Sequence, residues 1–170
     1  MITYQTLRHI IDGAISGTLT EQECYHQLVY HITQKLHSRQ ASIWYFQDTE
    51  VAVSQISYNA ELRTYSSGQI LHKNSGKDIF IILKSGNMVS MPDVSHHYLT
   101  PSIGSNILFQ PDTKSLFAIP ITFRSKSVGF VCSEHNGSKT LKLQYNEISY
   151  LDTVVSLVTH LLFNLHPQKQ

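Results

Sequence analysis

Residues 115–135 have the sequence SLFAIPITFRSKSVGFVCSEH, which predicts a β-hairpin at the centre of the fold. Apolar side chains occupy both alternating sets of positions from Leu116 to Phe123, so both faces of this strand are expected to be buried. The polar segment Arg124–Ser127 is expected to form the turn. The second strand then places Cys132 and Glu134 on one face. Because the hairpin needs cover on both faces, we expect helices on one side and a ligand cavity on the other.

The composition is that of a single globular domain. The chain has 170 residues, of which 41% are hydrophobic and 15% charged, and its formal net charge is +1. This length is sufficient for a real core, and so small a net charge gives no indication of binding to nucleic acid or anionic membranes. Cys24 and Cys132 are too few for a disulfide framework, which favours a cytoplasmic location. The most apolar tract, Ile148–Leu165, contains Asp152 and other polar groups, so no membrane insertion is expected.

Two helices and a second hairpin are expected in the first third of the chain. Residues 2–16 carry an apolar stripe at helical spacing. Thr20–Glu23 matches a capping box, in which Thr20 is the N-cap of a second helix that ends near Ser38. The β-branched and aromatic segments Ala41–Gln47 and Val51–Tyr58 are expected to pair as strands.

Between residues 59 and 110, hydrophobic periodicity predicts fewer helices and strands than in the rest of the chain. Asn59–Gly76 is polar and is expected to be a loop with a short strand near Gln69–Leu71. The run Asp78–Leu83 fits a buried strand and the start of a helix equally well. Met88–Met91 predicts another short strand, and Val94–Leu108 a loop with one helical turn.

The final predicted helix runs from about Tyr145 to Leu165 and has two apolar stripes. One stripe can pack on the sheet, and the other is left over. The helix at residues 2–16, a second copy of the chain, or both in a symmetric bundle would cover this second stripe, and we expect a homodimer. The stripe with coiled-coil spacing consists of Ile148, Leu151, Val155, Val158 and Leu162.

In order and spacing, these motifs resemble a GAF domain over residues 20–165. The resemblance is carried by Ser115-Leu116, Pro120-Ile121, Gly129-Phe130-Val131 and the Glu134-His135-x-Gly137 ending, which is similar to GAF domains at the N-terminus of bacterial diguanylate cyclases and sensor histidine kinases. It implies an α+β fold with a GAF/PAS-like central antiparallel sheet of five to six strands. The N- and C-terminal helices would pack on one face, and loops with a short helix would form a pocket on the other.

The resemblance also assigns the ambiguous segments. It favours a helix at residues 78–83, with Asp78 as its cap and Gly86 ending it. It divides the single domain 1–170 into an N-terminal helix at 1–18, a GAF core at 20–165 and the start of a linker at 166–170.

The function implied by the resemblance is that of a sensory module without catalytic activity. It would bind a small molecule under a lid formed by Val94–Leu108 and pass the signal through its terminal helices to an output domain outside this chain. The alternative is a ligand-free GAF domain that serves as a dimerisation scaffold. The ligand-binding residues are expected to be Phe80, Asp93, Tyr98, Leu99, Ile103, Phe117, Cys132 and Glu134.

Several of these residues also have a purely structural interpretation. Asp93 can cap the turn at Ser95 and His96, and Glu134 can bond a neighbouring loop. Cys132 lies three positions from His135, hence on the opposite face of the strand, so a thiol–imidazole pair is excluded there. The ten histidines show no metal-ligand spacing, and residues 93–110 contain no cysteine for the covalent attachment of a bilin.

Overall fold

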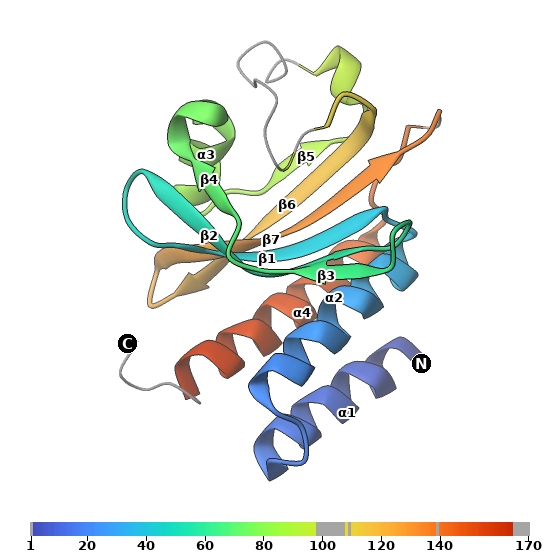
Figure 1. The fold of residues 1–170 in the computed structure, drawn as a ribbon, viewed down its shortest axis with the longest axis vertical. Coiled ribbons are helices and arrows are strands. Elements are labelled where there is room, and N and C mark those ends of the chain that lie inside the picture. The colour runs from blue at the N-terminus through green and yellow to red at the C-terminus, as the bar shows by residue number, and fades with distance from the viewer. Residues whose placement is uncertain (1, 98–107, 109, 139, 165–170) are drawn as a thin grey trace.

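The computed structural model describes residues 2–97, 108, 110–138 and 140–164. Within them the chain forms an α+β fold with an open antiparallel sheet, as predicted (Figure 1). The sheet has seven strands rather than five to six, because a further short strand, β3 (Thr64–Ser66), also pairs with β2 (Val51–Asn59). The helices are α1 (Ile2–Ser16), α2 (Glu21–Leu36), α3 (Lys77–Lys84) and α4 (Tyr145–Asn164). The strands are β1 (Gln40–Phe46), β2 (Val51–Asn59), β3 (Thr64–Ser66), β4 (Ile70–His72), β5 (Val89–Met91), β6 (Thr113–Phe123) and β7 (Lys126–Asn136).

The predicted hairpin of residues 115–135 is β6 and β7, and it lies near the middle of the sheet. The strand order is β3-β2-β1-β7-β6-β5, with β4 also paired to β2. The register sets Ala118 opposite Cys132 and Leu116 opposite Glu134. These four side chains therefore share one face of the sheet.

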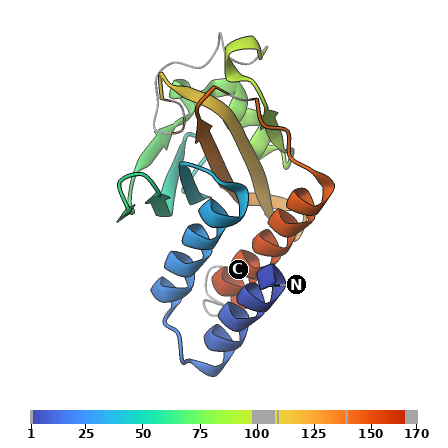
Figure 2. The same ribbon diagram turned by 90° about the vertical axis from the view of Figure 1, so that its right-hand side faces the viewer.

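Helices α2 and α4 cover one face of the sheet, which we call the helical face, and α1 packs against these two helices (Figure 1). Figure 2 shows this layer from the side, with α1 folded back along α2. The capping box at the start of α2 is confirmed. The backbone N–H of Glu23 donates a hydrogen bond to Thr20 Oγ1, and the backbone N–H of Thr20 donates one to the Glu23 carboxylate. Among the described helices, none has the combination of length and hydrophobicity that a membrane span requires.

Most of both apolar stripes of α4 are buried within this chain. Leu151, Val158 and Leu162 of the predicted dimer seam are 2%, 0% and 6% exposed, and Leu151 and Val158 belong to the core that the sheet forms with α1 and α2. Among the described residues, α1 and α2 thus supply most of the cover for the second stripe, which corresponds to the alternative of cover within the same chain. Ile148 and Val155 remain half-buried.

The opposite face of the sheet carries α3, and we call it the α3 face. The helix predicted for residues 78–83 is confirmed, although its N-cap is Gly76 rather than Asp78. Its buried side chains join a second core in which Trp44 and Phe130 stack, with ring centroids 5.8 Å apart and planes 7° apart. Apolar side chains thus fill much of the face on which a ligand pocket was expected.

Gly129 allows β1 and β7 to approach each other closely. A Cβ atom built on this residue would lie 2.0 Å from the carbonyl oxygen of Trp44 and 3.0 Å from Cδ1 of Tyr45. A side chain therefore cannot be accommodated here without separating the two strands. This contact gives a physical reason for a glycine in the second strand of the hairpin.

Candidate functional site

A small hollow on the α3 face brings together two of the predicted ligand-binding residues, Cys132 and Glu134. We call it the polar hollow, and its volume is about 10 Å³, scarcely that of a water-sized probe. Strand pairing sets Ser42 opposite Cys132 and Gln40 opposite Glu134, which places all four side chains on one face. Its lining consists of Gln40, Ser42, Leu108, Cys132 and Glu134.

Glu134 is held by a buried ion pair with Arg39. The Arg39 Nε donates to Glu134 Oε2 over 3.0 Å and Nη2 donates to Oε1 over 2.5 Å. Thr113 Oγ1 adds a third hydrogen bond to Oε1, over 3.2 Å. The two charged side chains are 9% and 7% exposed. The hydrogen bonds to Glu134 raise the pKa of the Arg39 guanidinium, so the charged form is favoured in spite of burial.

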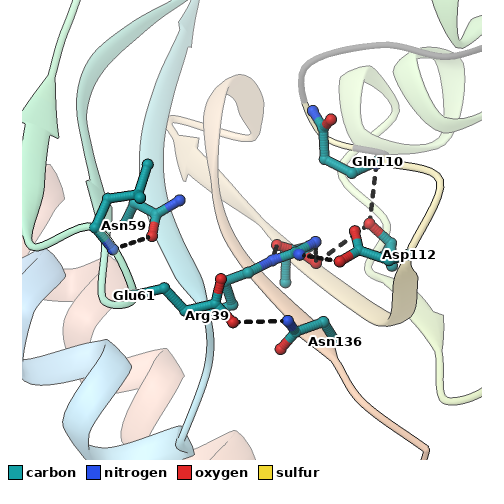
Figure 3. A network of polar contacts seen from close by, with 9 residues as sticks. Arg39, Asn59, Glu61, Gln110, Asp112 and Asn136 are labelled. Carbon is teal, nitrogen blue, oxygen red and sulfur yellow. Dashed lines mark hydrogen bonds and ion pairs between the residues drawn. The ribbon is translucent and has the colours of Figure 1, made fainter.

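Arg39 also connects three segments at this end of the sheet (Figure 3). Its Nη1 donates to Asp112 Oδ2 over 2.7 Å, which fixes the segment entering β6. Its backbone N–H donates to the carbonyl of Glu134 over 2.9 Å, and its own carbonyl accepts from Ala60 over 2.7 Å. Arg39 follows α2 after the left-handed C-cap His37, with φ 53°. The end of α2 is thus joined directly to the wall of the polar hollow.

The remaining polar groups of the hollow are bonded to the sheet. Gln40 Nε2 donates to Ser57 Oγ over 2.8 Å, and Trp44 Nε1 donates to Ser42 Oγ over the same distance. Cys132 is 2% exposed, and burial raises the pKa of its thiol far above its usual range. A neutral buried thiol is a poor nucleophile, so Cys132 is suited to contact rather than to covalent chemistry.

Asp93 lies outside the polar hollow and caps a short helical turn. Its Oδ1 accepts from the backbone N–H and the hydroxyl of Ser95, over 3.2 and 2.7 Å, and from Lys114 Nζ over 3.0 Å. Its Oδ2 is 3.0 Å from His96 Nδ1. Hydrogen bonds from Ser95, Lys114 and His96 lower the pKa of Asp93 well below its usual range. The geometry thus matches the capping interpretation of Asp93.

The other predicted ligand-binding residues are dispersed. Phe80 lies on the α3 face within the core, with its ring edge-on to Phe46 at 5.1 Å between centroids. Phe117 lies on the helical face, because it alternates with Leu116 and Ala118 along β6, and its ring contacts His135. Phe117 therefore lies on the opposite face of the sheet from Cys132 and Glu134. Tyr98, Leu99 and Ile103, with most of the predicted lid, lie outside the described residues.

Solved structures with this architecture identify the fold. The GAF domain of a phosphoenolpyruvate-protein phosphotransferase from Acinetobacter matches with a TM-score of 0.72 and 17% identity, over 98% of this chain and 95% of that one. The phycocyanobilin-bound GAF domain of a cyanobacterial phytochrome matches with a TM-score of 0.74 and 15% identity, over 98% and 96%. This chain has the GAF fold. The GAF domain of A. Aeolicus nlh2, solved in an inactive state, matches over 99% and 97%, with a TM-score of 0.63 and 14% identity. No protein-family model and no curated protein matches the sequence.

Within this GAF fold, sequence reasoning missed three residues around the polar hollow. Gln40 lies just before the predicted strand, and Ser42 is the second residue of that strand. Strand alternation places both residues on the same face as Trp44. Arg39 has no local signal, because it lies in the short link after α2 and its partner is 95 positions away. Among the described residues of the GAF fold, no group of three or more His, Cys, Asp or Glu side chains is placed to hold a metal ion.

Proposed function

We propose that this chain is a regulatory GAF module that binds a small polar molecule at the polar hollow and has no catalytic activity of its own. The observation that carries the proposal is the buried Arg39–Glu134 pair, in which Glu134 lines the hollow and Arg39 follows the end of α2. A structure of the same fold is described as phycocyanobilin-bound, which supports small-molecule binding as a use of this fold.

Hydrogen-bonding capacity at the hollow favours a ligand with an N–H donor. Glu134 accepts three described hydrogen bonds, from two nitrogens of Arg39 and from Thr113. An ionised carboxylate offers about four acceptor positions, so one is left for a ligand amine or amide. Cys132 and Ser42 would contact its less polar part. Because the hollow holds scarcely one water, the ligand must displace neighbouring side chains on entry.

The signal would leave the hollow through Arg39. A ligand donor that competes for Glu134 would change how the guanidinium is held between Glu134 and Asp112. Arg39 lies three positions beyond the last residue of α2, and α2 packs against α1 and α4. A change in pose of these helices would then reach an output domain outside this chain.

The proposed arrangement follows the sequence resemblance. The domain comprises residues 1–170, with the core at 20–165 and a linker beginning at 166. The module would act in the bacterial cytoplasm as a homodimer. The half-buried edge of α4, Ile148 and Val155, is proposed as the part of the seam that contacts the second copy.

A ligand-free scaffold is the second candidate function. It is favoured by the packing of the α3 face, where Trp44, Phe130 and their neighbours form a filled core. In that case the Arg39–Glu134 pair would serve stability alone.

Native mass spectrometry of the purified full chain, before and after mild unfolding, separates the two candidates. A sensory module is expected to carry a discrete additional mass that is released on unfolding. The Cys132→Leu variant, which fills the hollow, should lose this mass, whereas the near-isosteric Cys132→Ser variant should retain it. If no additional mass accompanies the parent, and metabolite mixtures leave its melting temperature unchanged, the scaffold is favoured.

A further inference from the structure

A second and larger cavity lies at the opposite end of β7 from the polar hollow. Its volume is about 870 Å³. It is formed where the β1–β2 and β6–β7 turns meet the ends of α3 and α4. We call it the turn cavity. Strand β7 begins at Lys126 in this cavity and reaches the polar hollow only at Cys132 and Glu134, so the two sites share no lining residue.

Positive charge is concentrated on the turn cavity. Lys84, Arg124 and Lys126 line it, whereas Asp48 is the one acidic residue among its described lining residues. The Asp48 carboxylate already accepts backbone hydrogen bonds from Glu50 and Val51, over 2.7 and 2.9 Å. Among the residues that the structure describes, neither Lys84 nor Lys126 forms an ion pair. Burial and the neighbouring Lys126 lower the pKa of Lys84, partly offset by the Asp48 carboxylate, so an added anion would favour the charged form of Lys84.

Aromatic rings hold two of these cations in place. Lys84 Nζ lies 4.5 Å from the ring centroid of Phe46. The Arg124 guanidinium lies 5.1 Å from the ring centroid of Phe123, which stacks on Phe163 at 3.8 Å with 9° between the planes. Cation–π contacts restrict the side chains before a ligand arrives, which reduces the entropy lost on binding.

We propose that the turn cavity binds a phosphorylated small molecule of about nucleotide size. Three cations around one cavity match a phosphate dianion or a polyphosphate better than a single carboxylate, and arginine suits phosphate oxygens geometrically. The cavity volume falls within the usual range of small-molecule sites. Leu162 and Phe163, in the last turn of α4, form its apolar wall, so an occupant contacts this helix directly. The site goes beyond the function proposed above and does not depend on it.

Titration of the full chain with ATP, inorganic tripolyphosphate and adenosine tests the proposal. Isothermal titration calorimetry is expected to detect binding of ATP or tripolyphosphate and none of adenosine. Amide NMR shifts should concentrate at Lys84, at residues 124–127 and at the end of α4. Binding of adenosine equal to that of ATP, absence of binding by both phosphates, or shifts away from the cavity would each overturn the proposal.

Charge-matched double variants distinguish a built site from general attraction. The pair Lys84→Gln and Lys126→Gln is expected to weaken phosphate binding about tenfold. The pair Lys35→Gln and Lys142→Gln removes the same charge elsewhere and should leave binding unchanged. Lys84→Arg together with Lys126→Arg keeps the cations and should restore it. Equal weakening by both glutamine pairs would contradict the proposed site, and circular dichroism verifies that each variant is folded.

Discussion

The guanidinium of Arg39 and the carboxylate of Glu134 form a two-point ion pair between residues 95 positions apart in the chain. The pair closes one end of the sheet, because Arg39 enters β1 and Glu134 lies near the end of β7. It lies within the protein, where removal of one partner leaves the other charge without compensation.

Loss of either charge should therefore destabilise the fold substantially. Arg39→Gln is expected to lower the free energy of unfolding by about 3 kcal/mol, because it leaves the Glu134 carboxylate buried and unpaired. Arg8→Gln is a matched control, since its pair with Asp12 is 83% and 68% exposed and should cost less than about 0.5 kcal/mol. Urea denaturation followed by circular dichroism gives both values, and equal stabilities of the two variants would contradict the structural role of the pair.

Acid should weaken the fold through His135. This side chain is 3% exposed, and burial lowers its pKa to about 4. The unfolded chain takes up the proton at the ordinary pKa of about 6.5, so stability is lost as pH falls through the interval between the two values. The loss amounts to about 3 kcal/mol.

A pH series of urea denaturation curves between pH 7.5 and 4 tests this prediction. The His135→Gln variant should show a flatter dependence than the parent, because the buried imidazole is absent. His9→Gln, at an exposed position, should follow the parent. Parallel curves for His135→Gln and the parent would show that the loss of stability comes from other groups.

Gly129→Ala should be among the most damaging single-methyl additions in this chain. The added carbon meets the Trp44 carbonyl at 2.0 Å, and relief requires separation of β1 from β7, at a cost of several kcal/mol. Gly17→Ala is the comparison: nothing lies within 4 Å of its added carbon, and strain arises from its φ of +76° alone, which costs about 1 kcal/mol. Thermal denaturation orders the two variants, and the reverse order would disprove the close approach.

The proposed homodimer predicts different effects for two charge substitutions on α4. Val155→Glu places a charge on the half-buried edge of the helix and should dissociate a homodimer while leaving the fold intact. Leu151→Glu puts the same charge at a position that is 2% exposed, and it should unfold the chain whatever its oligomeric state. Sedimentation velocity and circular dichroism separate the two effects. A monomeric parent would end the dimer proposal.

The regular elements were largely predictable from local patterns. The hairpin of residues 115–135, the capping box at Thr20 and the final helix from Tyr145 follow from periodicities that the structure retains. The segment 78–83 is helical, although periodicity alone left it open. Strand β3 was missed because its three residues, Thr64–Ser66, are all exposed and carry no apolar alternation.

The candidate site was less predictable because it depends on which face of the sheet turns toward the helices. Phe117 and Leu116 alternate on a strand that is apolar on both faces, so the sequence does not distinguish the two sides. Only the register with β7, which sets Leu116 opposite Glu134, places Phe117 on the helical face. Arg39 was missed for a related reason, since the contact that defines its role lies far away in the sequence.

The placement of the aromatic residues gives the molecule two separate optical reporters. Trp44, the single tryptophan of the chain, lies in the α3-face core, whereas Tyr25, Tyr58 and Tyr150 lie in the core of the helical face. Tryptophan emission therefore follows the packing around α3, and the part of the absorbance that comes from these three buried tyrosines follows the layer of α1, α2 and α4. A disturbance that begins on one side of the sheet and crosses to the other would be visible as a delay between the two signals, without any attached label.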